Sequence, residues 1–365
     1  MIQIDFESLR ALGLGPALAR SAHEVADPDD PLSVDDLRLM RLTEVHRETV
    51  RVHDGEHEHG VRVLPRLLRE LAAADTALAV GDWVLCGIDV YGDYRVHARV
   101  PPLSSICRRD ADGRRHPVVS NVDTALLVMG LDDDFNPRRL ERYLALVQAS
   151  GMLPVVVLTK ADVAARTPGL IEARIEALRG RVPAQVAVLA VDGTDPATAS
   201  RLTAWLAAGQ TVVVLGSSGA GKSTLTNNLL GTDVQDTGAV RAHDSRGKHT
   251  TTSRSLHRLP GGACVIDTPG LRTLRPDADE ATLAAVFEDV QALAAQCRFR
   301  DCRHADEPGC AVRDGIDADR LRNFHKLLRE SRRDTLTLLE RQQQMAVWKQ
   351  RGKAARARAK FEKGE

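Results

Sequence analysis

The pattern of apolar and polar positions divides the chain into two kinds of region. Between about 46 and 120, short β-prone runs separated by turn residues predict a small β-barrel. Its size is typical of an oligonucleotide-binding (OB-like) barrel, and an SH3-like barrel would give the same pattern. The barrel would offer phosphate contacts through a set of arginines: Arg95, Arg99, Arg108, Arg109, Arg114 and Arg115.

From about 121, apolar strands alternate with helical periods. The predicted strands cover 124–129, 153–158, 184–189, 211–216 and 263–267, and the predicted helices cover 137–150, 169–180 and 221–230. This alternation indicates an α/β fold, in which one parallel sheet is covered by helices on both faces. After 280 the pattern is helical, at about 280–295 and 318–346.

These patterns predict five successive parts. They are an acidic N-terminal extension (1–43), the barrel (44–118), the α/β domain (119–278), a helical domain (279–348) and a basic C-terminal tail (349–365). No apolar run has the roughly 18 residues that cross a bilayer, and no secretory signal opens the chain. We therefore expect a cytoplasmic protein that does not contact membranes and is a monomer.

Charge is distributed unevenly along this neutral chain. Residues 1–45 hold nine acidic residues against four arginines, whereas residues 320–365 hold 14 Lys and Arg against five acidic residues. A basic tail of this kind indicates a polyanion partner, because neutralised phosphates release counterions on binding. A solvated helix face followed by a frayed end would give the same composition.

A phosphate-binding loop follows the predicted strand 211–216. Its residues match G-x-x-x-x-G-K-[ST] and precede a predicted helix, as that motif requires. The glycines allow backbone N–H groups to surround phosphate oxygens, Lys222 reaches the β- and γ-phosphates, and the Ser223 hydroxyl binds Mg²⁺. The nucleotide-binding residues of this loop are Gly216, Ser217, Ser218, Gly219, Ala220, Gly221, Lys222, Ser223 and Thr224.

Two further segments fit the switch regions of a GTPase. Asp267-Thr-Pro-Gly270 ends a predicted strand, so that Asp267 would hold Mg²⁺ through water and the Gly270 N–H would contact the γ-phosphate. The loop His249-Thr250-Thr251-Thr252 lies between this segment and the phosphate loop, and one of its threonines would close on Mg²⁺. A threonine-rich loop without a catalytic role would look the same.

A base-reading segment, Thr159-Lys160-Ala161-Asp162, ends the strand 153–158. Asp162 would accept the N1 and N2 hydrogens of guanine, Lys160 would pack over the base, and Thr159 replaces the usual asparagine. A position at the carboxyl end of a parallel strand, where such sheets bind ligands, makes this short motif specific.

Three cysteines and a histidine form a compact set near the C-terminal end: Cys297, Cys302, His304 and Cys310. A Cys₃His set closes a tetrahedral structural zinc site and leaves no open position for catalysis. Free buried cysteines are the alternative. Cys86, Cys107 and Cys264 lie in apolar runs, where packing explains them.

The order of the motifs is unusual, because Asp162 precedes Lys222 by sixty residues. Ordinary GTPases carry the base-reading motif after the phosphate loop, so this site must form from a circularly permuted chain. In this order, and in its Val80-Gly-Asp-Trp-Val and Val119-Ser-Asn-Val-Asp123 segments, the chain resembles the RsgA (YjeQ) family over most of residues 79–312. The resemblance does not extend to the acidic segment 1–40.

The resemblance implies an OB-like barrel, a circularly permuted GTPase domain and a zinc domain. It also implies hydrolysis of GTP to GDP and phosphate, stimulated by the small ribosomal subunit late in its maturation, with rRNA as a partner. Because Leu271 stands where Ras-like enzymes have a glutamine, another group must orient the attacking water. The resemblance favours His249, and a group from the partner is the alternative.

Two other functions fit parts of the pattern. A P-loop ATPase or small-molecule kinase would use the same phosphate loop, but Asp162 stands where guanine is read. An RNA-binding module with a vestigial nucleotide site would retain the fold, but Lys222, Ser223 and Asp267 are all present.

Overall fold

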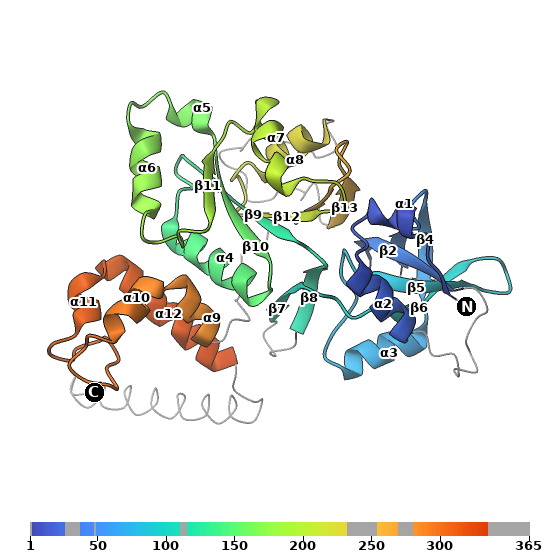
Figure 1. Cartoon of the computed structure of the whole chain (residues 1–365), viewed down its shortest axis with the longest axis horizontal. Helices are drawn as coiled ribbons and strands as arrows, with labels where there is room; N and C mark the ends of the chain where they lie inside the picture. Colours follow the sequence, from blue (N-terminus) through green and yellow to red (C-terminus); the bar gives the residue numbers. More distant parts are fainter. Residues whose placement is uncertain are drawn as a thin grey trace, which may run out of the picture.

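The computed structural model describes residues 2–25, 37–46, 49–109, 115–231, 254–268 and 280–334 (Figure 1). The strands are β1 (Ile2–Gln3), β2 (Leu37–Val45), β3 (Thr49–His53), β4 (Glu58–Val63), β5 (Trp83–Ile88), β6 (Tyr94–Arg99), β7 (Ser105–Arg109), β8 (Arg115–Ser120), β9 (Thr124–Gly130), β10 (Leu153–Thr159), β11 (Ala187–Ala190), β12 (Thr211–Gly216), β13 (Ser255–Arg258) and β14 (Cys264–Asp267). The helices are α1 (Phe6–Arg10), α2 (Pro16–Val25), α3 (Pro65–Ala73), α4 (Pro137–Ala149), α5 (Ala161–Ala164), α6 (Leu170–Leu178), α7 (Ala197–Arg201), the 3₁₀ helix η1 (Thr203–Trp205), α8 (Lys222–Leu230), α9 (Glu280–Val286), α10 (Glu288–Ala294), α11 (Ala311–Gly315) and α12 (Ala318–Asp334).

The central α/β domain is built on strands in the order β11-β10-β9-β12-β14-β13, of which the first five are parallel. Side chains alternate between the two faces of a strand. Leu127 and Val156 accordingly join the core beneath α4, while Leu126 and Val212 pack with Leu225 of α8. Helices therefore cover both faces of the sheet, with α4 on one side and α7 and α8 on the other (Figure 1). This confirms the predicted α/β arrangement.

A five-stranded barrel precedes this domain. Strands β2, β3, β4, β6 and β5 pair in that order, and β5 closes the circle by pairing with β2. The barrel has its own apolar interior, in which Met40, Val52 and Val96 are completely buried. Ser255 of β13 pairs with Glu44 of β2, so the barrel and the α/β sheet form one continuous hydrogen-bonded sheet.

The N-terminal residues are more ordered than the sequence predicts. The expected extension 1–43 instead contains α1, α2 and the first seven residues of barrel strand β2. Leu9, Leu12 and Leu18 are each at most 4% exposed and belong to the central core. The segment is rich in Asp, Pro and Ala, and this composition obscures the apolar pattern of its two short helices. The described part of this segment is integral to the fold.

A buried arginine joins this segment to both domains. Arg41 of β2 has no exposed surface and donates to the carbonyls of Leu12 and Asn121 and, at 2.8 Å, to Thr211 Oγ1. Its guanidinium also lies 5.5 Å from the ring centroid of Trp83. Burial lowers the pKa of Arg41, although the charges of nearby acidic groups oppose that effect. One side chain thus connects the N-terminal helices, the barrel and β12.

The strands near the end of the barrel also differ from expectation. β7 and β8 form a separate two-stranded hairpin, and helix α3 and strand β13 lie where no helix or strand is predicted. Arg99, expected at the nucleic-acid surface, instead pairs with the completely buried carboxylate of Asp82 at 2.8 Å. Arg95 pairs with Asp89 at 2.8 Å. Both arginines therefore stabilise the barrel itself.

The C-terminal helical domain, α9 to α12, packs against α4. Glu141 of α4 is 1% exposed and accepts hydrogen bonds from Arg320 Nη1 at 2.8 Å, Asn323 Nδ2 at 2.5 Å and Arg181 Nη1 at 3.2 Å. Burial lowers the pKa of Arg320, but hydrogen bonds to Asp289 and the charge of Glu141 outweigh this and raise it. The two domains are joined through a buried, fully paired polar network.

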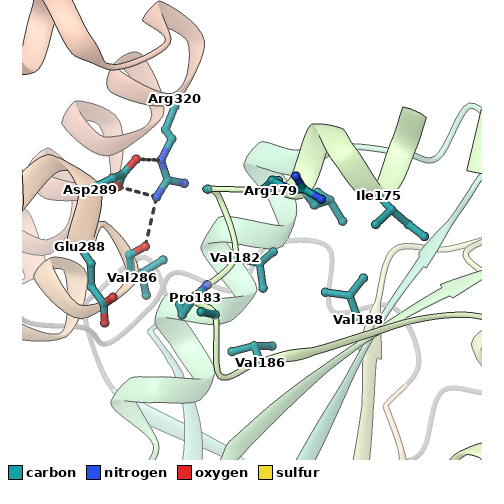
Figure 2. A pocket seen from close by; sticks show the side chains of 13 residues that line it. Ile175, Arg179, Val182, Pro183, Val186, Val188, Val286, Glu288, Asp289 and Arg320 are labelled. Atoms are coloured by element: carbon teal, nitrogen blue, oxygen red, sulfur yellow. Dashed lines mark hydrogen bonds and ion pairs between the residues drawn. The ribbon is translucent and has the colours of Figure 1, made fainter. Parts of the chain in front are cut away.

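A pocket of about 440 Å³ borders this junction (Figure 2). Val182, Val186 and Val188 line its α/β side, and Arg320 faces them from the helical domain. Arg320 donates to both carboxylate oxygens of Asp289, at 2.7 and 2.8 Å, and to the Val286 carbonyl.

In the described part of the chain, no helix is long and apolar enough to span a membrane.

Candidate functional site

The motifs of the predicted nucleotide site lie where neighbouring parallel strands end. The sheet places β10 and β12 on either side of β9, and β14 next to β12. Thr159 ends β10, Gly216 ends β12 and Asp267 ends β14. Parallel strands have their carboxyl ends at one edge of a sheet, so the three motifs meet although they are far apart in the sequence.

The phosphate-binding loop adopts the tight conformation that its glycines allow. A Cβ at Gly216 would lie 2.3 Å from the Val128 carbonyl oxygen, and Gly221 has a φ of 88°. Helix α8 begins directly afterwards at Lys222, whose ammonium group donates to the Ser217 carbonyl at 2.7 Å. The loop thus leads into the positive end of a nine-residue helix, an arrangement that attracts anions.

The base-reading segment contacts the phosphate loop directly. Thr159 Oγ1 donates to the Ala220 carbonyl at 2.6 Å. Lys160 has a φ of 60°, and its ammonium group donates to Asp132 Oδ2 at 2.6 Å. Burial raises the pKa of Asp132, but the bond from Lys160 and a backbone N–H outweigh it and lower that pKa. Asp162 stands exposed in the first turn of α5.

The loop after β9 contributes residues that the sequence analysis missed. Asp134 Oδ1 accepts from Ser217 Oγ at 2.6 Å and from Arg139 Nη2 at 2.6 Å, while its Oδ2 accepts from the Gly130 N–H at 3.2 Å. Asp134 therefore fixes the first serine of the phosphate loop. The available signal was an acidic run, Asp132-Asp133-Asp134, directly after the apolar strand beside β12.

Asp267 lies buried at the end of β14. It is 4% exposed, and its Oδ1 has no hydrogen-bond partner in the described residues. Burial raises the pKa of this carboxyl group, and the nearby charge of Lys222 lowers it in part. An unpartnered buried carboxylate oxygen costs free energy unless a cation or water satisfies it. The chemistry of this position therefore fits a water-coordinated Mg²⁺ beside Ser223.

Four predicted residues lie outside the described part of the chain. They are His249, Thr250, Thr251 and Gly270, which belong to 232–253 and 269–279. Their roles stay predictions from the sequence.

The four zinc-ligand candidates are brought together between α10 and α11. Their ligand atoms all lie within 4.8 Å of one another. His304 Nδ1 is 3.6 Å from Cys297 Sγ and 3.5 Å from Cys310 Sγ, and the two sulfurs are 4.0 Å apart. Tetrahedral zinc with bonds of about 2.3 Å to sulfur and 2.0 Å to nitrogen requires separations of about 3.5 Å between nitrogen and sulfur and about 3.8 Å between two sulfurs. The cluster could therefore hold a metal ion.

Comparison with known proteins agrees with the family resemblance seen in the sequence. The family model of the RsgA GTPase matches residues 100–276. The small ribosomal subunit biogenesis GTPase RsgA of Xanthomonas oryzae pv. oryzae (strain MAFF 311018) is 47% identical over 295 residues, which cover 79% of each chain. Its counterpart in Xanthomonas axonopodis pv. citri (strain 306) is 44% identical over 337 residues, or 89% of each chain.

Two solved structures share the fold. YjeQ from Thermotoga maritima matches with a TM-score of 0.57 and 21% identity, over 81% of this chain and 98% of that one. YloQ, described as a circularly permuted GTPase, matches with a TM-score of 0.55 and 21% identity, over 82% and 97% of the two chains. Together with the close relatives, the permuted motif order and the joined nucleotide motifs, they establish that this chain belongs to the RsgA GTPase family.

Proposed function

We propose that this chain hydrolyses GTP to GDP and phosphate, and that the small ribosomal subunit stimulates the reaction late in the maturation of that subunit. The hydrogen bond from Thr159 to Ala220 carries the nucleotide assignment, because it joins a base-reading segment to a phosphate loop. The Xanthomonas relatives, named as small ribosomal subunit biogenesis GTPases, support the partner.

Each site residue has a distinct task in this proposal. Asp162 reads guanine, Lys160 packs along the base, and Thr159 holds the segment against the phosphate loop. Ala161 completes the base-reading segment, and its N–H donates to the Val191 carbonyl at 3.1 Å. Backbone N–H groups from Gly216 to Thr224 surround the phosphates, and Lys222 neutralises the charge that develops during transfer. Ser223 and Asp267 would hold Mg²⁺, which supplies further charge neutralisation at the β- and γ-phosphates. Thr250 or Thr251 and the Gly270 N–H would complete the site around the γ-phosphate.

We also propose a binding role for each of the other domains. The barrel and the C-terminal helical domain contact rRNA on either side of the GTPase domain, and the basic tail adds phosphate contacts. The Cys297, Cys302, His304 and Cys310 cluster binds one structural zinc ion. The protein acts in the cytoplasm as a monomer.

The test is GTP turnover by the purified chain, alone and with small subunits, with ATP and large subunits as controls. Stimulation by small subunits alone is the expected result. Equal turnover with ATP and GTP would overturn the guanine assignment. Equal slow GTP turnover in every mixture would refute the small ribosomal subunit as the stimulating partner.

The Asp162→Asn variant is expected to bind GTP about 10- to 100-fold more weakly, because one charge-assisted hydrogen bond to guanine is lost. The asparagine amide presents one acceptor and one donor, which suit xanthine better than guanine. Titration of fluorescent GDP against unlabelled GTP and XTP measures both changes. Asp133→Asn removes the same charge from a neighbouring exposed position and should leave the preference for guanine unchanged. Unchanged GTP affinity in Asp162→Asn would remove Asp162 from base recognition.

The His249→Ala variant is expected to lower turnover stimulated by small subunits while leaving GTP affinity nearly unchanged. The reason is that orienting the attacking water matters only during the chemical step. Single-turnover hydrolysis with small subunits measures it, and His57→Ala, in an exposed barrel loop, is the matched control. A stimulated rate equal to that of the parent chain would show that another group, such as one from the partner, orients the water.

A further inference from the structure

A basic groove lies between helix α4 of the GTPase domain and helix α12 of the C-terminal domain. It has a volume of about 540 Å³. Two helices supply its cationic residues, with Arg138 and Arg142 one helical turn apart on α4, and Arg322, Lys326 and Arg329 at successive turns of α12. Residues three or four apart share one helix face, so each helix presents a cationic row to the groove.

The charge of this groove is only partly neutralised. Asp319, Asp134 and Glu330 pair with Arg138, Arg139 and Arg142 respectively. On the α12 side, by contrast, the ammonium group of Lys326 has no hydrogen-bond or ion-pair partner within the described ranges. Arg322 is 67% exposed and reaches Asp319 only at 3.5 Å.

The start of α4 adds to the positive potential. The helix begins at Pro137 and runs for 13 residues, so its positive end faces the same groove as Arg138. Asn136 caps the helix and also lines the groove. Within the part of the chain that the structure describes, the groove therefore combines an unpaired lysine, an arginine bonded only to the His325 carbonyl (Arg329) and partly neutralised arginines with a helix N-terminus.

One groove residue is connected to the phosphate loop. Arg139 donates to Asp134 Oδ1 at 2.6 Å, and the same oxygen accepts from Ser217 Oγ at 2.6 Å. An anion that pairs with Arg139 would compete with Asp134 for the guanidinium. The position of Asp134, and with it the serine of the phosphate loop, then depends on whether the groove is occupied.

We propose that this groove binds the phosphodiester backbone of single-stranded RNA and that its occupancy is coupled to nucleotide binding through Arg139 and Asp134. The proposal takes RNA as the partner class from the proposed function. Cations distributed along two helices match successive phosphates of a chain better than one compact anion, because each phosphate finds a separate positive group. The groove also bridges the two domains, so a bound strand would contact both.

The first test measures binding of a fluorescein-labelled 20-nucleotide oligouridine at several KCl concentrations. The Lys326→Gln/Arg329→Gln variant is expected to bind about 10- to 30-fold more weakly at about 0.1 M salt, and to reduce the salt slope by about 1.4, as two lost phosphate contacts require. Arg166→Gln/Arg179→Gln removes two exposed arginines outside the groove and should bind RNA as the parent chain does. Circular dichroism verifies that each variant is folded.

Several results would refute the proposal that the groove binds RNA. One is an unchanged affinity and salt slope in the groove variant, and another is an equal loss in the control variant. Competition by polyglutamate as strong as by unlabelled RNA would show a site for polyanions in general. If the parent chain bound no oligonucleotide but small subunits still stimulated its GTP turnover, the groove would be refuted while the proposed function would stand.

The second test measures the affinity for fluorescent GDP with and without saturating oligouridine. The parent chain is expected to show a difference of about 5-fold or more, and RNA affinity should change by the same factor when GDP is added, since coupling is reciprocal. Arg139→Gln should retain most of the RNA affinity but lose the difference. An RNA-independent GDP affinity in the parent chain would refute the coupling.

Discussion

Removal of the proposed zinc ion is expected to unfold the C-terminal helical domain while the GTPase sheet stays folded. The segment from Cys297 to Cys310 contains no regular element, so the proposed zinc ion supplies its main constraint. Cys310 is completely buried and caps α11, and its sulfur accepts from the Arg313 N–H at 3.4 Å. Structural zinc contributes about 10–16 kcal/mol of apparent binding free energy in small domains, which is folding free energy when no site exists in the unfolded chain.

Hydrogen exchange measured by mass spectrometry distinguishes the two domains. After chelation, or in Cys310→Ser, amides of α10 to α12 should lose protection, whereas those of β9 and β12 should keep it. Cys107→Ser changes a buried cysteine of the β7–β8 hairpin and should leave α10 to α12 protected. Full protection of these helices in a chain that elemental analysis shows to be free of metal would contradict the prediction.

The convergence of the predicted nucleotide motifs was predictable because they depend on local sequence and a simple rule of parallel sheets. The apolar runs of β9, β10 and β12 are buried on both faces, which produces continuous hydrophobic segments that are easy to recognise. Glycines in the phosphate loop and the carboxyl-end rule then place the motifs together whatever their order in the chain. The order of the motifs predicts the permuted topology, and the family resemblance added the ribosomal partner.

The parts that sequence reasoning missed depend on long-range contacts. Asp134 has no motif of its own, and its role follows from the approach of β9 to the phosphate loop. Arg99 looked like a surface cation because nothing local reveals that Asp82, seventeen residues away, is buried beside it. β13 has only four residues, and its place in the sheet comes from pairing with β14 and β2. Tertiary contacts decide all three positions.

The Glu141→Ala variant is expected to destabilise the attachment of the C-terminal domain by about 3–5 kcal/mol, the usual cost of leaving a buried charge without its partner. Glu141 is 1% exposed and accepts three hydrogen bonds, so truncation removes a buried, charged acceptor from each of Arg320, Asn323 and Arg181. Asp289 still pairs with Arg320, which keeps the cost at the level of one broken ion pair. Native-state hydrogen exchange of the α12 amides measures the change in opening free energy without assuming that the whole chain unfolds in one step.

Two further variants separate charge from packing. Glu141→Gln keeps the size and one acceptor of the side chain and should cost less than Glu141→Ala, because Arg320 loses only the charge of its partner. Glu176→Ala removes the exposed partner of Arg179, and surface ion pairs contribute at most about 1 kcal/mol, so its effect on α12 should be close to zero. Equal opening free energies in Glu141→Ala and the parent chain would mean that apolar packing, rather than the network around Glu141, holds α12 against α4. Such a result would also separate the α4–α12 groove from this network, since its cations would then be positioned by packing alone.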